Sequence, residues 1–198
     1  MLRKLFFILF IFSGCYATAQ QSQTIEKFKQ QAFNPEYAWQ SKYLFDYDVH
    51  FYFINISISP ISTAINGNVT IGVSSLVDKP DTFAVELIPE MLIDSAFMNG
   101  QKLSKPVRKG DNILFPITRI LTKGTQFSVK IYYHGTTPTN GFFSGVATGY
   151  NKTWKKHVTW TLSEPFAAKA WFPVKQDLQD KADSAWIFLT VDSNYMAG

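Results

Sequence analysis

The chain has 198 residues, of which 46% are hydrophobic and 16% aromatic, and its formal net charge is +4. This composition excludes intrinsic disorder and allows one domain with a sizeable core. Without Arg3 and Lys4, which lie in a terminal segment that we expect to be removed, the charge is 17 − 15 = +2. No basic patch interleaved with aromatic residues supports nucleic-acid binding.

The N-terminus has the pattern of a secretory signal. Arg3 and Lys4 precede an apolar run, Leu5 to Phe12, that is too short to span a membrane as a helix. Ala17-Thr18-Ala19 is a small-x-small cleavage site. We therefore expect residues 1–19 to be a signal peptide. The exported protein would be periplasmic or secreted, and its mature chain would have no transmembrane helix.

A lipid anchor is the alternative for the same segment. Phe12-Ser13-Gly14-Cys15 resembles a lipoprotein box, in which the lipid would be attached to Cys15. The aromatic Phe12 is unfavourable at the first position of such a box. Cleavage after Ala19 would instead remove Cys15, the only cysteine. The mature protein would then have no disulfide and no cysteine-based metal site.

Residues 20–42 form a polar, Gln-rich leader that is expected to be a short helix or an extended segment. Short strands and turn signals follow it. From Tyr43 the apolar pattern alternates with a period of two, and one long strand is predicted around 48–57. Further strands are predicted over 68–74, 82–87, 93–98, 113–115, 127–133 and 186–191. The turn signals are Asn66-Gly67, Asn99-Gly100 and Gly110-Asp111-Asn112. This pattern predicts an all-β fold over residues 43–198, an antiparallel β-sandwich or a saddle-shaped sheet.

The most unusual chemistry lies in residues 159–184, TWTLSEPFAAKAWFPVKQDLQDKADS. Pro165 and Pro173 predict an irregular passage, and its aromatic residues are expected to be buried. Glu164, beside a proline and flanked by aromatics, could receive the ammonium group of a ligand. The alternative is a loop carboxylate bonded to nearby backbone N–H groups, and residue chemistry alone favours that alternative.

This segment resembles the signature of the aminopeptidase N family of zinc metallopeptidases (gluzincin aminopeptidases), particularly the secreted bacterial forms. The family pattern runs T-Q-S-E-P, a small-residue pair, a basic residue, W-W-P-C-K-D and D-K-A-D-S. The matching residues here, in order, are T-L-S-E-P (161–165), A-A-K (167–169), W-F-P-V-K (171–175) and D-K-A-D-S (180–184). Weaker matches upstream extend the resemblance over roughly residues 43–198.

The resemblance implies that the chain is the N-terminal β domain of such an enzyme. In the family, the glutamate of this signature helps to bind the free α-amino group of the peptide substrate, and by position it is Glu164. An ammonium group and a partly desolvated carboxylate form a strong charge-assisted hydrogen bond. The implied partners are peptide N-termini, in a full-length enzyme, and a downstream catalytic domain.

Zinc is expected in that downstream domain and not in this chain. The three histidines, His50, His134 and His157, form no H-E-x-x-H motif, whose spacing places two imidazoles on one helix face. We therefore assign no catalytic residue and no metal ligand here.

Several positions of the segment depart from the family pattern. Leu162 replaces a Gln, Val174 a Cys and Gln176 an Asp. Lys169 replaces an Arg, which keeps the charge but loses the bidentate fork. Trp171 matches. Leu162, Lys169 and Trp171 are the residues expected to support Glu164.

Two functions remain open at this point. In the first, the chain is the substrate-recognition domain of an exported zinc aminopeptidase, shapes the cleft and is inactive alone. In the second, it is a free-standing exported β-sandwich that binds peptides or a partner protein without catalysis. An exposed apolar face, where a catalytic domain would dock, would favour the first.

Overall fold

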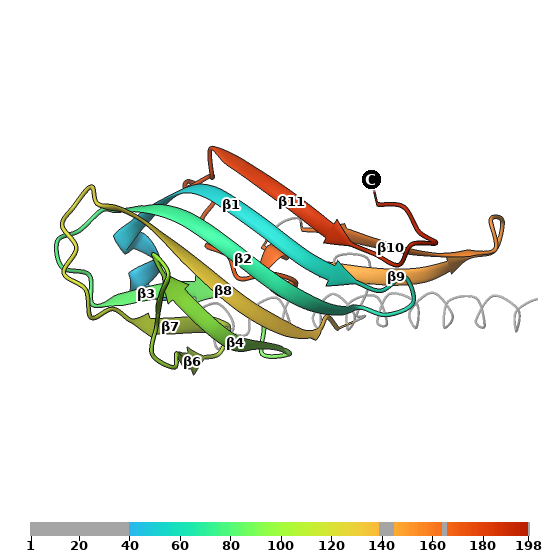
Figure 1. Ribbon diagram of the computed structural model, residues 1–198, viewed down its shortest axis with the longest axis horizontal. Helices are drawn as coiled ribbons and strands as arrows, with labels where there is room; N and C mark the ends of the chain where they lie inside the picture. The colour runs from blue at the N-terminus through green and yellow to red at the C-terminus, as the bar shows by residue number, and fades with distance from the viewer. Residues whose placement is uncertain (1–39, 139–144, 164–165, 198) are drawn as a thin grey trace, which may run out of the picture. The chain divides into compact units, whose positions relative to one another are not determined.

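The strands of period two form a six-stranded sheet (Figure 1). The computed structural model describes residues 40–138, 145–163 and 166–197. The sheet order is β11-β1-β2-β8-β4-β5. The strands are β1 (Tyr47–Ile58), β2 (Ala64–Ser75), β4 (Met91–Met98), β5 (Gln101–Lys102), β8 (Gln126–Thr136) and β11 (Ser184–Thr190). Neighbouring strands are antiparallel except β11, which pairs parallel with β1 and was not predicted to do so.

Two smaller sheets complete the described fold. One contains β3 (Thr82–Glu86), β7 (Asn112–Pro116) and β6 (Val107–Lys109), and the other is the hairpin of β9 (Gly145–Asn151) and β10 (Lys156–Leu162). Two short 3₁₀ turns, η1 (Lys42–Asp46) and η2 (Ala168–Ala170), are the only helical elements in the described ranges. No helix in these ranges is long and apolar enough to cross a membrane.

The core lies between the six-stranded and three-stranded sheets. Phe83 of β3 packs against Tyr47 of β1 and Phe127 of β8, with ring centroids 4.8 and 6.2 Å apart. Buried and partly exposed residues alternate along β1 and β8, whereas β3 and β7 are buried along most of their length. Burial along a whole strand is typical of strands covered on both faces. The predicted all-β, sandwich-type fold is confirmed.

The turn predictions had mixed outcomes. Asn99-Gly100 joins β4 to β5, and Gly110 lies between β6 and β7, as predicted. The prediction of a turn at Asn66-Gly67 is wrong, because both residues lie inside β2. A Cβ at Gly67 would lie 2.2 Å from the Asn55 carbonyl oxygen, so this glycine allows the two strands to approach each other closely.

The β9–β10 hairpin was missed. Residues 159–162 were expected to be irregular, but they form the end of β10. The strand does carry a period-two signal, because Val158, Trp160 and Leu162 alternate with Thr159 and Thr161. The expectation of an irregular passage over 159–184, which rests on Pro165 and Pro173, overrode that signal. Thr148 Oγ1 donates to the Pro60 carbonyl oxygen at 2.7 Å, and Thr159 Oγ1 donates to that of Ser59 at 3.1 Å. These bonds hold the hairpin beside the β1–β2 turn, as Figure 1 shows.

Candidate functional site

The candidate site segment leaves β10 at Leu162, passes through η2 and continues to β11. Leu162 is half-buried. Glu164 and Pro165 lie outside the described residues, as do the predicted signal peptide and Cys15, so the role of Glu164 stays a prediction. The described residues on either side show how the ends of this loop are held.

Trp171 fixes the N-terminal end of the loop. Its indole Nε1 donates to Ser163 Oγ at 2.8 Å, and Tyr133 Oη, from the middle of the large sheet, donates to its carbonyl oxygen at 3.0 Å. Trp171 and Phe172 are both buried, with their ring centroids 4.5 Å apart. Ser163, the residue before Glu164, is therefore tied to the core.

Phe166 departs from the expectation for the aromatic residues of this segment. Trp171 and Phe172 are buried as predicted, but the Phe166 side chain is 47% exposed. Its φ of 65° lies in the left-handed region, which non-glycine residues occupy rarely. The backbone turns sharply here, and the turn directs an aromatic ring toward solvent.

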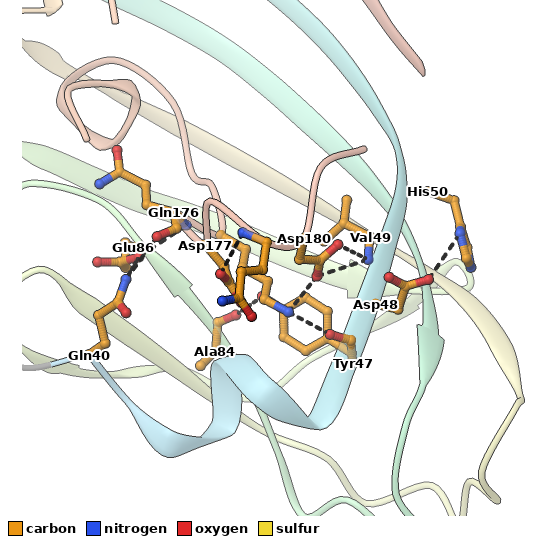
Figure 2. Close-up of polar contacts among 12 residues, drawn as sticks. Gln40, Tyr47, Asp48, Val49, His50, Ala84, Glu86, Gln176, Asp177 and Asp180 are labelled. Atoms are coloured by element: carbon orange, nitrogen blue, oxygen red, sulfur yellow. Dashed lines mark hydrogen bonds and ion pairs between the residues drawn. The ribbon is translucent and has the colours of Figure 1, made fainter. Parts of the chain in front are cut away.

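Glu86 is the main anchor on the other side of the loop. Its backbone exchanges two hydrogen bonds with Val174, at 2.7 and 3.1 Å. Its Oε2 accepts hydrogen bonds from the Gln176 backbone N–H at 3.1 Å and from Gln40 Nε2 at 3.2 Å (Figure 2). Burial raises the pKa of the Glu86 carboxyl, and these hydrogen bonds together with Lys169 oppose that rise.

Lys169 supplies the positive charge of this cluster. Its Nζ lies 2.8 Å from Asp111 Oδ2 and 4.0 Å from Glu86 Oε1, and its backbone N–H donates to Gln176 Oε1 at 2.9 Å. Two of the departures from the family pattern, Lys169 and Gln176, therefore act together to hold η2. Asp111 Oδ1 is buried and has no hydrogen-bond donor among the described residues.

A second buried pair ties the end of the segment to β1. Lys175 Nζ donates to the Tyr47 carbonyl oxygen at 2.7 Å and forms an ion pair with Asp180. Asp180 also accepts a hydrogen bond from the Val49 backbone N–H at 3.2 Å (Figure 2). Asp180 is thus occupied as a structural carboxylate.

The described residues do not fit a zinc site. They contain no group of three or more His, Cys, Asp or Glu side chains that could hold a metal ion. His50 shares a hydrogen bond with Ser74, and His134 is bonded to Asp94. The ring of His157 packs against Tyr150, with centroids 5.1 Å apart.

The sequence identified Lys169 and Trp171 but missed three distant residues of the cluster around Lys169. Glu86, Asp111 and Gln40 lie 58 to 129 residues away from Lys169 in the chain (169 − 111 and 169 − 40). Glu86 gave one usable signal, because a charged residue ends an otherwise apolar strand. Nothing in the sequence indicated that its partners were Gln40 and Gln176.

Solved structures with a similar fold are known, although no protein-family profile matches the sequence and no curated protein matches it significantly. An M1 zinc metallopeptidase from Deinococcus radiodurans has a TM-score of 0.60 and 20% identity, covering 75% of this chain and 33% of its own. A two-domain M1 zinc metallopeptidase bound to L-arginine has a TM-score of 0.62 and the same identity and coverage. Leukotriene A4 hydrolase from Saccharomyces cerevisiae has a TM-score of 0.56 and 18% identity, covering 69% of this chain and 22% of its own.

At these identities the likeness establishes the fold. This chain has the β fold found in part of the M1 zinc metallopeptidases and of leukotriene A4 hydrolase, as the signature predicted. It spans about a third of the length of the two metallopeptidases.

Proposed function

We propose that this chain is the substrate-recognition domain of an exported zinc aminopeptidase, in which it binds the N-terminus of a peptide and is inactive alone. The observation that carries the proposal is the agreement between two independent features. The segment around Glu164 resembles the aminopeptidase N signature, and the fold is that of part of the M1 zinc metallopeptidases. Because the chain spans a third of their length, we assign zinc binding and catalysis to the remainder of such an enzyme.

The proposed role of Glu164 is to accept hydrogen bonds from the peptide's α-ammonium group. A charge-assisted hydrogen bond of this kind contributes about 1.5–3 kcal/mol. It would favour peptides with a free N-terminus, because an acetylated N-terminus has no charge. Leu162, Trp171 and Lys169 act as positioning residues in this proposal, since they flank the loop, and the last two anchor its ends.

A binding comparison tests the amine site on the chain itself. The affinity of a short peptide with a free N-terminus is measured beside that of its N-acetylated form, by calorimetry or by NMR titration. We expect the free amine to bind more tightly by roughly tenfold or more, given the strength of a charge-assisted bond. Glu164→Gln should abolish this difference and leave the fold intact.

Glu90→Gln is the matched control, because Glu90 is an exposed glutamate outside the candidate segment. It should leave the preference for the free amine unchanged. Equal affinity of the wild-type chain for both peptides, or an unchanged preference in Glu164→Gln, would remove Glu164 from the proposed site.

A free-standing binding protein is the second candidate. Leu162, Val174 and the other departures from the family pattern favour it, since a domain that no longer serves catalysis can lose parts of the signature. Under this hypothesis the native protein would have the mass of this chain and would show the same preference for free amines without any peptidase activity.

A further inference from the structure

A serine, a histidine and two carboxylates meet on the six-stranded sheet. His50 Nε2 of β1 lies 2.6 Å from Ser74 Oγ of β2. On the other side of the imidazole ring, Nδ1 lies 3.3 Å from Asp48 Oδ2 and 3.5 Å from Asp183 Oδ2. Figure 2 shows the contact between His50 and Asp48. The four side chains follow the order hydroxyl, imidazole, carboxylate, which is the order of a nucleophile, its base and the group that orients the base.

The two carboxylates determine which nitrogen of His50 carries the proton. An ionised carboxylate can only accept a hydrogen bond, so Nδ1, which faces Asp48 and Asp183, must be the protonated nitrogen of the neutral ring. Nε2 then holds the lone pair, and the Ser74 hydroxyl must donate to it. This tautomer is the one in which a histidine can take the proton of a serine nucleophile.

The backbone holds this arrangement in the interior of the sheet. In the sheet order, β1 lies between β11 and β2, and β2 lies between β1 and β8, so no contact of the group depends on an unpaired edge. His50 is the extra residue where the β1–β2 register shifts between Val49 and Phe51. A bulge of this kind re-aims a side chain, and bulges are over-represented beside active sites.

A hollow of about 720 Å³ lies against His50 on the sheet. Gly72 lines it and has no side chain to fill it, and Gln126 of β8 lines it from the other side. Gln126 is also directly opposite Ser74 in the β2–β8 pairing. Because directly opposed residues have Cβ atoms about 4.5–5.5 Å apart, the Gln126 amide can reach an oxygen bound near Ser74. Side-chain amides of this kind stabilise the oxyanion of acyl transfer.

We propose that Ser74 and His50 hydrolyse small carboxylic esters that have good leaving groups. Ser74 Oγ bonds to the carbonyl carbon while its proton moves to His50 Nε2. The bond between that carbon and the leaving oxygen then breaks, and His50 returns the proton to the departing oxygen. A water molecule, which gives its proton to the same nitrogen, attacks the acyl-serine. The carboxylic acid leaves, and Ser74 recovers its proton from His50.

The exposure of the group limits the substrate class. The side chains of His50, Asp48 and Asp183 are 35%, 45% and 79% exposed, so water reaches the reacting atoms. Electrostatic stabilisation of an oxyanion is weaker in water than in an enclosed site. We therefore assign activated esters and not amides. The activity is separate from peptide hydrolysis, for which the proposed function leaves the chain inactive alone.

Turnover of p-nitrophenyl acetate by the purified full chain is the first test. We expect many p-nitrophenolate molecules to be released per chain, whereas simple acetylation of surface lysines would release only a few. Ser74→Ala should reduce the rate to that of buffer. His50→Gln should lower it about 100-fold, because general base catalysis typically contributes at least that much.

Covalent labelling identifies the nucleophile. A fluorophosphonate probe should attach to Ser74, with a bond from Oγ to phosphorus replacing the phosphorus–fluorine bond, and peptide mass spectrometry would locate it. Labelling should be lost in Ser74→Ala and strongly slowed in His50→Gln. Circular dichroism of both variants would verify that they are folded.

His134→Gln and Ser57→Ala are the matched controls. His134 lies in the same sheet and also has a carboxylate partner, Asp94, with Nδ1 2.8 Å from Oδ1. Ser57 is an exposed serine of β1. Neither variant should change the turnover of p-nitrophenyl acetate or the labelling by the fluorophosphonate.

The two carboxylates act as positioning residues, and their variants test that role. Either carboxylate alone can keep Nδ1 protonated, so Asp48→Asn and Asp183→Asn should each cause a small loss. The double variant should lower kcat on the order of 100-fold and leave KM unchanged, because substrate binding does not involve these side chains. A loss in kcat equal to that of one single variant would remove the carboxylates from the proposed mechanism.

Four results would overturn the inference. They are a rate no higher than that of buffer, a probe attached to a residue other than Ser74, unchanged turnover in Ser74→Ala or His50→Gln, and loss of turnover in His134→Gln. None of them bears on Glu164 or on the binding of peptide N-termini, so the inference and the proposed function fail separately.

Discussion

At the residue scale, Lys169 places one positive charge beside two buried carboxylates, those of Asp111 and Glu86. Its Nζ reaches one oxygen of Asp111, and the other oxygen has no donor among the described residues. Lys169→Arg offers a planar fork that can donate to both oxygens, so we expect the free energy of unfolding to rise by about 0.5–1.5 kcal/mol. Chemical denaturation measures this change.

Lys169→Met is the comparison variant. It leaves Asp111 and Glu86 without their cation, and removal of one partner from a buried ion pair costs roughly 3–5 kcal/mol. If the Met variant were as stable as the wild type, the charge of Lys169 would not hold η2.

Glu86 makes stability depend on pH. Burial is the largest effect on its carboxyl, and it raises the pKa above the ordinary value of 4.5. The folded state therefore binds a proton more tightly than the unfolded state does. This contribution to the free energy of unfolding is complete below pH 4.5 and is lost as the pH rises through the folded-state pKa.

Glu86→Gln should remove that loss, because the amide does not titrate and its oxygen can still accept the hydrogen bond of the Gln176 backbone N–H. The measurement is the free energy of unfolding at a series of pH values for both proteins. Parallel pH profiles would show that Glu86 keeps its ordinary pKa in the folded state.

At the element scale, the β9 strand begins against η2 of the candidate segment. Gly145 has a φ of 82°, and a Cβ there would lie 2.7 Å from Ala170 Cβ. Gly145→Ala therefore combines backbone strain with a steric clash. We expect the strain to cost about 1–2 kcal/mol and the clash to add roughly 1–3 kcal/mol.

Gly124→Ala separates these two effects. Gly124 has nearly the same φ, 83°, but a Cβ there meets nothing within 4 Å. Thermal unfolding of both variants should show the smaller loss for Gly124→Ala. Equal losses would mean that β9 and η2 can move apart at no cost.

At the whole-molecule scale, the expected export makes a prediction about mass. Cleavage after Ala19 removes Cys15 and leaves a chain that begins at Gln20, whereas lipidation of Cys15 would add the mass of a lipid. Intact mass spectrometry of the protein from its source cells distinguishes the two. We expect no lipid. A polypeptide several times heavier than this chain would support the proposed aminopeptidase, and the mass of residues 20–198 alone would favour the free-standing binding protein.

The sequence by itself determined the β class, most strand positions and the location of the candidate segment. Alternation with a period of two is a local property, and β1, for example, carries it in its own residues. The β9–β10 hairpin escaped although Val158, Trp160 and Leu162 of β10 alternate with threonines, because Pro165 and Pro173 favoured an irregular passage from Thr159 on. The candidate residues Trp171 and Lys169 were found because they lie in the single short stretch that resembles the family signature.

Only the tertiary structure decided which distant residues hold that stretch. Glu86 meets Gln176 and Lys169 meets Asp111 through side-chain contacts that leave no periodic trace in the chain. The parallel pairing of β11 with β1 likewise depends on where the intervening chain returns to the sheet. Strand pattern is encoded locally, whereas partners and register are chosen by the packing of the whole core.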